Sequence, residues 1–365
     1  MIKAGIVGAG NISGIYLQNG SRFESMEIAA IADMDHARAV SRAQQYGVRA
    51  LSVEEMLQDP ELELVINLTI PQAHAAVNLQ ALEANKHVYV EKPFAVTLEE
   101  GRQVLRLAKA KGLYAGGAPD TFLGGGLQTC IKLIQDGAIG TIVGATAFMM
   151  SGGHESWHPD PAFYYKKGGG PLFDMGPYYM TALVAMLGPV KRVTGAARMT
   201  RQERLITSQP KAGEIIQVEV PTHVAGIMEM EAGPIATLLT SFDVAGGSVL
   251  PRIEVYGTEG TLLVPDPNDF GGKVLLRQAA DSDWREVPLT HGYHENARGL
   301  GAADMAKAIL TGRTHRASGH MAYHVLETMH AFHASHSAGT HIVIDSTCAQ
   351  PAPLPVGLQD GKLDG

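Results

Sequence analysis

Residues 2–13 read IKAGIVGAGNIS, and this stretch decides the fold. Its first half is apolar enough for a short buried strand, and Gly8 and Gly10 follow directly. This is the dinucleotide-binding fingerprint, whose first glycines permit a tight turn and let the backbone approach a pyrophosphate. Ser13 replaces the third glycine and is still small enough for helix–strand packing. We therefore predict that the phosphates are bound by Gly8, Gly10, Asn11 and Ile12.

A carboxylate follows where the fingerprint expects one. The apolar stretch Ile28–Ala32 predicts a second strand, and Asp33 comes directly after it. At this spacing a carboxylate binds the ribose hydroxyls and repels a 2′-phosphate, so the sequence favours NAD over NADP. Asp35 is an alternative for this role, and either aspartate can instead be a surface helix cap.

Strands and helices alternate through the first third of the chain. Further strands are expected at 62–68, 87–90 and 113–115, and helices at 35–46, from 52, at 72–84 and from 97 to 112. Ser52–Glu55 and Thr97–Glu100 have the capping-box pattern that marks a helix start. This alternation predicts a parallel sheet with right-handed crossovers, which is a Rossmann domain over residues 1–120.

The pattern changes after residue 120. Strands are expected at 141–149, 190–198, 215–220, 222–231 and 234–242, with hairpin turns at 231–234 and 257–260. Helices are expected at 127–135, 174–187, 297–310 and 319–336. The predicted fold class is therefore α/β, with an N-terminal Rossmann domain and a C-terminal α+β domain (residues 121–345) on a mostly antiparallel sheet. Residues 346–365 are expected to form a loosely held tail.

Composition excludes several functional classes. The 365 residues are 45% hydrophobic and 18% charged, as in a folded globular protein of about two domains. The formal net charge is −8 without a long run of like charges, which argues against a nucleic-acid partner. Cys130 and Cys348 make neither a disulfide framework nor a zinc cluster. Because no bilayer-spanning run and no signal-type region before Ile2 is found, we expect a cytoplasmic protein without a membrane partner.

A second motif, Glu91-Lys92-Pro93, ends the strand at 87–90. Pro93 disfavours helical geometry at Lys92 and cannot donate to a sheet ladder, so the chain stays extended and then turns. This aims the ammonium off the carboxyl end of a buried strand, where open α/β sheets place their ligands. Further residues predicted to bind the cofactor at this edge are Thr69, Pro71, His74, Glu91 and Lys92.

Residues 152–179 form the third dense cluster of chemistry. The stretch begins as a long loop rich in aromatic and hydrogen-bonding residues, a composition that suits a sugar with its apolar faces and polar rim. Asp174 and Tyr178 stand four apart and are expected on one face of the helix at 174–187. The predicted substrate contacts are Asp120, His154, Trp157, His158, Asp160 and Asp174.

The fingerprint, Glu91-Lys92-Pro93 and the later motif Asp174-x-Gly176-x-Tyr178 together resemble the glucose–fructose oxidoreductase / inositol dehydrogenase / rhizopine-catabolism (Gfo/Idh/MocA) family over nearly the whole chain. The resemblance implies that Lys92 lies between nicotinamide and substrate, that the Lys92–Pro93 peptide is often cis, and that Asp174 contacts substrate. The family position of Tyr178 is commonly an acid/base histidine, although members resembling glucose–fructose oxidoreductase and dihydrodiol dehydrogenase carry tyrosine. A further family position, often aspartate, is Thr181 here. The resemblance also implies a homodimer or homotetramer.

These residues imply a hydride transfer between NAD and a ring hydroxyl or ketone of a sugar, glycoside or cyclitol. Tyr178 is the candidate base, and its phenol, with an ordinary pKa of ~10, needs help from a cation such as Lys92. Lys92 is an alternative proton carrier if burial lowers its own pKa, and Asp174 then orients the substrate hydroxyl or fixes the lysine. Alternative functions are a glycoside-cleaving enzyme that keeps NAD bound and a non-catalytic NAD-binding regulator.

Several histidines near the end of the chain have helical spacing. They are His320, His324, His330, His333 and His336. No HExxH pattern accompanies them and no acidic ligands converge, so we predict no metal site and treat them as polar positions on a helix.

Overall fold

The structure, a computed structural model, describes residues 1–364, and its N-terminal part is a six-stranded sheet in the order β3-β2-β1-β4-β5-β6. All five strand pairs are parallel, which confirms the predicted Rossmann topology. The strands are β1 (Ile2–Val7), β2 (Met26–Ala32), β3 (Arg49–Leu51), β4 (Leu64–Asn67), β5 (His87–Val90) and β6 (Ala115–Gly117). The short β3 was not expected from the sequence.

The last strand of this sheet starts two residues later than predicted. Leu113 closes the preceding helix by donating its N–H to the carbonyl oxygen of Ala108. Tyr114 donates its N–H to Nδ1 of His87 at 2.9 Å. Both residues are therefore used in the turn, and the register with β5 begins at Ala115.

Five helices connect these strands, and the predicted helix starts are confirmed. They are α1 (Ser13–Gly20), α2 (His36–Tyr46), α3 (Val53–Gln58), α4 (Pro71–Glu83) and α5 (Leu98–Lys111). Ser52 and Thr97 both form complete capping boxes. Asp35 caps α2 by accepting the N–H of Arg38, which gives it the role of a surface helix cap.

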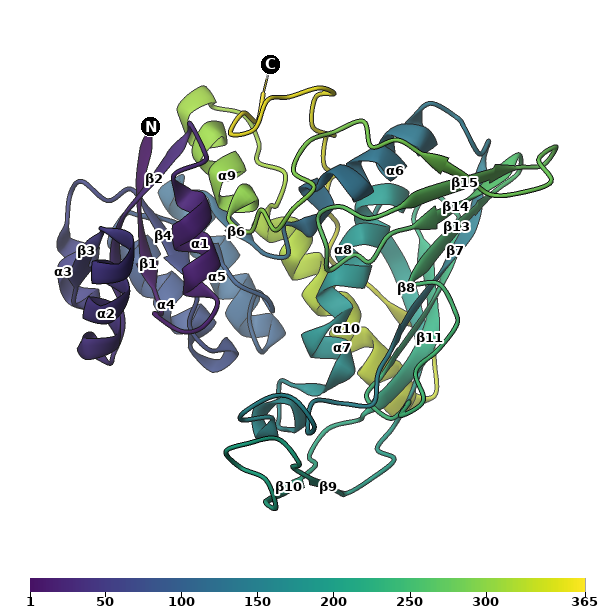
Figure 1. Ribbon diagram of the computed structural model, residues 1–365, viewed down its shortest axis with the longest axis horizontal. Helices are drawn as coiled ribbons and strands as arrows, with labels where there is room; N and C mark the ends of the chain where they lie inside the picture. Colours follow the sequence, from purple (N-terminus) through teal and green to yellow (C-terminus); the bar gives the residue numbers. More distant parts are fainter. Residues whose placement is uncertain (365) are drawn as a thin grey trace.

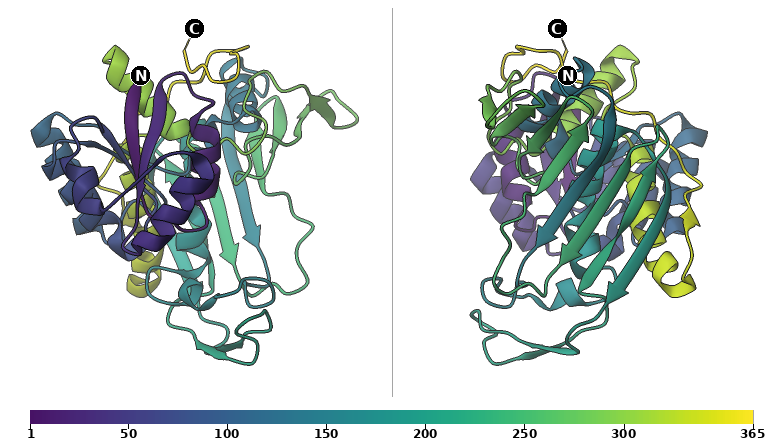
Figure 2. Two further views of the ribbon diagram at one scale, coloured as in Figure 1. Left: turned by 60° about the vertical axis from the view of Figure 1, so that its left-hand side comes forward. Right: turned by 90° about the vertical axis from the view of Figure 1, so that its right-hand side faces the viewer.

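The C-terminal part is a nine-stranded sheet in the order β16-β15-β14-β13-β7-β12-β11-β8-β17. Its strands are β7 (Ile142–Met150), β8 (Val190–Arg198), β11 (His223–Met230), β12 (Ile235–Ser241), β13 (Ile253–Gly257), β14 (Gly260–Val264), β15 (Val274–Gln278), β16 (Arg285–Val287) and β17 (Ile342–Val343). Only β7 and β12 pair in parallel, so the sheet is mostly antiparallel as expected. Figure 2 shows one face of this sheet open toward the viewer, with the helices behind it.

A separate hairpin, β9 (Glu203–Leu205) and β10 (Ile215–Gln217), projects below this sheet (Figure 1). The predicted strand at 215–220 is therefore too long. Val218 still donates its N–H to the carbonyl oxygen of Gln202, but Glu219 donates to the carbonyl oxygen of Tyr165, which ends the pairing. This bond ties the hairpin to the loop that the sequence singled out.

Helices fill the space between the two sheets (Figure 1). They include α6 (Gly125–Gln135), α7 (Gly170–Asp174), α8 (Gly176–Leu187), α9 (Leu300–Thr311) and α10 (Gly319–Ala338). Every residue of α8 is buried. Although α9 comes late in the chain, it packs on β1, β2 and β6, so it adds to the helical layer of the Rossmann sheet.

The prediction of a single helix over 174–187 is wrong, and the difference affects the site. The chain forms two helices that break at Met175, and Asp174 ends the first of them. Pro177 explains the break, because it has no N–H to donate to the carbonyl oxygen of Phe173. Asp174 and Tyr178 therefore do not share a helix face.

The C-terminal segment is not loosely held. Leu354 and Leu363 are each only 3% exposed. Leu354 donates its N–H to the side chain of Gln128, and Asp360 pairs with Arg22 at 3.0 Å. The sequence predicted a loosely held, Pro-rich tail, but its two buried leucines and the ion pair with Arg22 hold it in place; Figure 1 shows this segment in yellow.

Candidate active site

The ammonium of Lys92 joins the two domains. It leaves the end of β5 after a cis Lys92–Pro93 peptide. Its Nζ donates to the carboxylate of Asp174 at 2.7 Å and to the carbonyl oxygen of the same residue at 2.8 Å. Both side chains are mostly buried, at 19% and 14% exposure. The Glu-Lys-Pro motif and the later motif thus meet although 82 residues separate them.

Tyr178 completes this cluster from the first turn of α8. Its ring centroid lies 5.4 Å from Nζ of Lys92, and its side chain is buried. The fold therefore brings together the three side chains expected to be catalytic. Asp174 reaches the cluster from the end of α7 rather than from the same helix as Tyr178.

The charges of this cluster determine where a proton resides. Burial alone would lower the pKa of Lys92, but Asp174 and other neighbours outweigh it and the pKa is raised. The ammonium therefore stays charged. Lys92 would carry the substrate proton itself only if its pKa were lowered, and its pKa is raised instead. Burial raises the pKa of Tyr178, while Lys92 and Arg298 act against this shift without cancelling it. At neutral pH Tyr178 is therefore a neutral phenol.

The glycine-rich turn has the shape of a phosphate cradle. Gly8 has φ 111°, and a Cβ there would lie 2.6 Å from the carbonyl oxygen of Leu68. A Cβ at Gly10 would meet nothing within 4 Å, so the space beside this glycine is open. A cavity of about 410 Å³ lies there, and it is lined by Ala9, Gly10, Asn11, Arg38, Ser41 and Arg42. These residues fit the pyrophosphate and adenosine end of a dinucleotide.

Asp33 lies at the end of β2 as predicted. Its Oδ2 accepts the N–H of Ala9 at 2.7 Å, which holds the glycine-rich turn against the strand end. Its Oδ1 accepts the N–H of Asp35 at 2.9 Å. The carboxylate is thereby fixed beside the adenosine end of the cradle.

Two residues predicted to bind the cofactor hold loops together instead. His74 is fully buried, and its ring nitrogens lie 2.7 Å from the carbonyl oxygen of Pro93 and 3.0 Å from that of Thr69. The ring therefore ties the loop after β4 to the loop after β5 and has no free nitrogen. Glu91 accepts from the hydroxyl of Tyr16 at 2.8 Å, which fixes the start of the Glu-Lys-Pro turn. Thr69 lies beside Gly8, where a glycine Cβ would be 2.9 Å from the Thr69 nitrogen, and Pro71 is the first residue of α4.

The prediction that Asp120 contacts substrate is not supported by its position. It is 1% exposed, and its Oδ2 accepts the N–H groups of Gly299 and Gly301, each at 3.0 Å. It therefore fixes the start of α9 on the end of β6. Burial raises the pKa of this carboxyl to about 6. Asp120 was selected because it lies just after a strand, but residues at such positions can either bind a ligand or anchor a helix.

His154 is the predicted substrate residue that reaches the cluster. Its Nε2 lies 3.6 Å from Oδ2 of Asp174. The ring stacks on Tyr164 at a centroid distance of 3.7 Å, and its buried Nδ1 has no hydrogen-bond partner. Burial lowers the pKa of His154 to about 4, so the imidazole is neutral at physiological pH.

The rest of this loop divides between the site and the surface. Trp157 lies 5.2 Å from the ring of His154 and is 62% exposed. His158 packs edge-on against Tyr164 at 5.3 Å. Asp160 points elsewhere, because its exposed carboxylate pairs with Lys211 at 2.8 Å. The prediction that Asp160 contacts substrate is therefore not supported by its position.

Two residues of the site were missed. Tyr164 stacks on His154, and Asp174 and Lys92 both influence its pKa, which burial raises to about 12. The aromatic composition of residues 152–179 indicated a binding loop, but no pattern in the loop distinguished Tyr164 from the other rings. Arg298, in the segment before α9, opposes the effect of burial on the pKa of Tyr178. No local motif marks it, because only the return of the chain to the Rossmann domain brings it there.

Residues 1–364 contain no group of three or more histidine, cysteine, aspartate or glutamate side chains arranged to hold a metal ion. Of the histidines of α10, His320 and His336 are exposed, whereas His324 and His330 hydrogen-bond backbone groups. His324 is buried and accepts the N–H of Val190 at 2.9 Å, and His330 hydrogen-bonds the carbonyl oxygen of Val96 at 3.0 Å.

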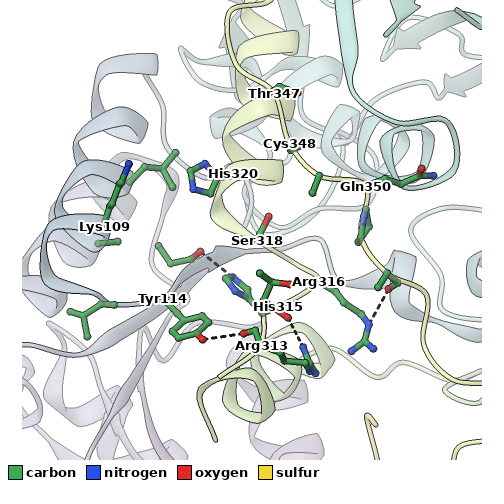
Figure 3. A pocket seen from close by; sticks show the side chains of 18 of the residues that line it. Lys109, Tyr114, Arg313, His315, Arg316, Ser318, His320, Thr347, Cys348 and Gln350 are labelled. Carbon is green, nitrogen blue, oxygen red and sulfur yellow. Dashed lines mark hydrogen bonds between the residues drawn. The ribbon is translucent and has the colours of Figure 1, made fainter. Parts of the chain in front are cut away.

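A larger cavity of about 870 Å³ lies away from this cluster, between α5, the segment before α10 and residues 347–352 (Figure 3). Its two arginines, Arg313 and Arg316, already pair with the buried Asp304. None of the residues predicted for catalysis or binding lines it. We therefore place the candidate site at Lys92 and not in this cavity.

No helix in residues 1–364 has the length and apolar character needed to cross a bilayer.

Comparison with known proteins matches both parts of the chain to one family. Residues 2–116 match the oxidoreductase family described as having an NAD-binding Rossmann fold, and residues 127–263 match the GFO/IDH/MocA C-terminal domain. The chain is 23% identical to D-xylose dehydrogenase of Paenarthrobacter nicotinovorans over 326 residues, which are 83% of this chain and 82% of that protein. It is 33% identical to inositol 2-dehydrogenase of Salmonella typhimurium over 115 residues, covering 30% of this chain and 34% of the relative.

Solved structures show the same fold. An NAD-binding oxidoreductase from Klebsiella pneumoniae superimposes with a TM-score of 0.82 at 20% identity, covering 94% of this chain and 99% of that one. Levoglucosan dehydrogenase in complex with NADH and levoglucosan gives 0.81 at 21% identity with the same coverage. With both of its domains matched, the chain belongs to the GFO/IDH/MocA oxidoreductase family, and residues 2–116 are the NAD-binding Rossmann domain of that family.

Proposed function

We propose that this protein is an NAD-dependent dehydrogenase that oxidises a ring hydroxyl of a sugar, glycoside or cyclitol, or reduces the corresponding ketone. The observation that carries the proposal is the contact of Lys92 with Asp174 at 2.7 Å, beside Tyr178 and at the carboxyl edge of the Rossmann sheet. D-Xylose dehydrogenase and inositol 2-dehydrogenase, which resemble this chain, are named for a sugar and a cyclitol.

Each residue has a separate task in this reaction. Nicotinamide, when bound, supplies the carbon that accepts or returns the hydride. The Lys92 ammonium, kept charged by Asp174, stabilises the negative charge that develops on the substrate oxygen. Tyr178 exchanges a proton with that oxygen, as a neutral phenol in reduction and as a phenolate in oxidation. Asp174 fixes the ammonium and offers its second oxygen, next to His154, to a neighbouring hydroxyl.

The first test is a screen of monosaccharides, glycosides and inositols with NAD and with NADP. A substrate is expected to change the nicotinamide absorbance in proportion to the product formed. Product release without net NADH would instead indicate transient oxidation with retained cofactor. Binding of NAD without turnover of any polyol would contradict the dehydrogenase.

We propose that Asp33 sets the preference for NAD. Its carboxylate is fixed by the N–H of Ala9 at 2.7 Å, where it opposes a 2′-phosphate. We expect Asp33→Ser to raise the ratio of kcat/KM with NADP to that with NAD by about tenfold or more, which corresponds to ~1.4 kcal/mol. Steady-state rates with both cofactors measure this ratio. The control is Asp35→Ser, because serine can keep the α2 cap; an equal change in both variants would contradict the assignment.

We propose that Trp157 and Phe163 bind the apolar face of the sugar. Both rings are more than half exposed beside the aromatic stack of His154 and Tyr164. We expect Trp157→Ala to raise KM by about 3- to 10-fold with little change in kcat, since ring stacking contributes ~0.5–1.5 kcal/mol. The control is Trp284→Ala, which alters the only other tryptophan. A fall in kcat with an unchanged KM would argue against this role.

We propose that the open face of the nine-stranded sheet mediates a homodimer or homotetramer. On adjacent strands of this face Ile227 and Ile235 are 45% and 53% exposed. Phe148 and Leu239 form a cross-strand pair farther along the same face, where Leu239 is opposite Ala225, and Figure 2 shows this face uncovered. Exposed apolar patches of this kind mark protein contacts. Light scattering measures the number of subunits, and a monomer at all concentrations would contradict the proposal.

A further inference from the structure

Arg204 is a buried arginine in the hairpin formed by β9 and β10. Its side chain is 2% exposed, and its guanidinium forms ion pairs with Glu155 at 2.5 Å and with Asp243. Its Cζ also lies 4.8 Å from the ring centroid of Tyr165. Burying such a charged network costs free energy even when the charges are paired, and apolar residues of similar volume often serve stability equally well. The network therefore calls for a reason other than stability.

The β9–β10 hairpin is hydrogen-bonded as a two-stranded sheet of its own, separate from both large sheets (Figure 1). The connection between its strands contacts residues 152–166, which we call the substrate loop. Thr207 and Ser208 donate their N–H groups to the carbonyl oxygen of Glu155 at 2.9 and 3.0 Å. The hydroxyl of Ser208 donates to the carbonyl oxygen of His158 at 2.5 Å. The hairpin thus supports the substrate loop.

Glu155 is the residue of the substrate loop that pairs with Arg204. Burial alone would raise the pKa of Glu155, but hydrogen bonds from Tyr165 and Arg204 outweigh this effect, so the pKa is lowered. The carboxylate is therefore ionised at neutral pH. The hydroxyl of Tyr165 donates to Glu155 at 2.5 Å and accepts the N–H of His154 at 3.2 Å. Through these bonds the guanidinium is joined to both ends of the loop.

Two of the residues that Arg204 contacts are adjacent in the chain to rings of the candidate site. Glu155 directly follows His154. Tyr165 directly follows Tyr164, whose ring stacks on that of His154 at a centroid distance of 3.7 Å. Both members of this stack are therefore held by a backbone neighbour that Arg204 fixes.

A third contact of the guanidinium leads to the same imidazole. The carbonyl oxygen of Phe242 accepts from Arg204 at 3.0 Å, and the ring of Phe242 packs edge-on against His154 at 4.5 Å. In turn, Nε2 of His154 lies 3.6 Å from the carboxylate of Asp174, which holds Lys92. Displacement of the imidazole would therefore change the surface beside the catalytic cluster.

On the basis of the function proposed above, we propose that Arg204 is a positioning residue for the substrate: its ion pair with Glu155 holds the aromatic rings of the substrate loop in the geometry that receives the sugar. The guanidinium does this without contacting the sugar, because protein groups enclose it. Lys92 and Tyr178 are held by other elements, the end of β5 and α8. The effect is therefore expected in substrate binding more than in the chemical step.

The kinetic test is Arg204→Met with the best polyol of the screen. We expect KM for the polyol to rise about tenfold, which corresponds to ~1.4 kcal/mol. We expect kcat to fall by less than about threefold and the affinity for NAD to stay unchanged. Arg204→Lys keeps the charge but loses the fork of N–H groups, so a smaller rise of KM is expected. If Arg204→Met does not fold, the same comparison is made with Arg204→Lys.

The controls separate positioning from stability. Arg316→Met also removes a buried arginine that pairs with a buried carboxylate, that of Asp304 at 2.5 Å, but this pair lies away from the candidate site. It is expected to lower the melting temperature without raising KM. Arg204→Met combined with Glu155→Gln and Asp243→Asn removes the carboxylates that would be left unpaired. This variant is expected to recover melting temperature while KM stays raised.

A second readout does not depend on turnover. Hydrogen exchange of the folded, ligand-free protein reports local opening of the backbone. In Arg204→Met we expect exchange in residues 152–166 to become about tenfold faster, while residues 87–97 in the same sample keep their rate. Arg316→Met is expected to leave the exchange of residues 152–166 unchanged.

Three outcomes would overturn the proposal. Unchanged exchange of the substrate loop in folded Arg204→Met would show that Arg204 does not hold the loop. Faster exchange with an unchanged KM would show that the order of the loop does not serve substrate binding. An equal rise of KM in Arg316→Met would show that KM follows general stability. If the wild type turned over no polyol, the proposed function would fail and the role in substrate binding with it, and faster exchange in Arg204→Met would then show a structural role alone.

Discussion

Replacement of Lys92 by methionine is expected to lower kcat/KM for polyol oxidation by about a thousandfold, while NAD binding is largely retained. The ammonium is held by the carboxylate of Asp174 at 2.7 Å and stays charged because Asp174 and other neighbours together outweigh the effect of burial on its pKa. Removing one preorganised group that stabilises the developing alkoxide costs about 10²–10³ in kcat, and loss of orientation of Asp174 and the substrate adds to it. Steady-state kinetics and a separate titration of NAD binding measure the two effects.

The control must separate chemistry from stability, because the variant leaves the carboxylate of Asp174 mostly buried without its partner. Lys92→Met combined with Asp174→Asn removes that unpaired charge and is expected to melt closer to the wild type while staying inactive. Lys86→Met is a matched control, since this buried lysine donates to the carbonyl oxygens of Asp59 and Leu62 away from the site. It is expected to lose stability but to keep the kcat of its folded fraction. If folded Lys92→Met kept more than about a tenth of the activity, this result would contradict the proposed mechanism.

Local patterns were sufficient to predict most of the fold. The apolar strand before Gly8 and the capping boxes at Ser52 and Thr97 are set by residues within a few positions of one another, and all three are confirmed. The hairpin at 231–234 is confirmed for the same reason, since it is a short turn between two alternating strands. Features that depend on residues close together in the sequence can therefore be predicted from the sequence.

The site was only partly predictable, because its residues meet through long-range contacts. Lys92 and Asp174 were found because each lies in a recognisable motif. Arg298 belongs to no motif and becomes part of the site only because the chain returns to the Rossmann domain at α9. Asp120 and His74 show the reverse error: Asp120 follows β6 and His74 lies in the first turn of α4, positions where ligands also occur, but both side chains hydrogen-bond backbone groups. Sequence spacing cannot distinguish these two uses of a buried polar side chain.

Replacement of Tyr178 by phenylalanine is expected to lower kcat for oxidation by about a hundredfold or more and to remove the alkaline limb of the pH profile. Burial raises the pKa of this phenol above its ordinary value of ~10, so the phenolate fraction increases as the pH rises toward that pKa. Oxidation by the wild type should therefore accelerate with rising pH, and reduction, which needs the neutral phenol, should slow above the same pKa. KM should change little, because the variant keeps the ring that packs in α8.

His154 is not expected to contribute a limb to the pH profile near neutrality. Its pKa is lowered to about 4 by burial, so it gives no limb between about pH 5 and 8, where an acid/base histidine with its ordinary pKa would titrate. The control is Tyr179→Phe, which removes a buried hydroxyl one residue away and is expected to leave the profile intact. If Tyr178→Phe kept the alkaline limb, or if a limb near neutrality vanished in His154→Gln, the proton would pass through a group other than Tyr178. The second outcome would point to His154. In the first, Lys92 is a candidate only if bound substrate and cofactor weaken its interactions with Asp174 and its other neighbours, because these together keep its ammonium protonated.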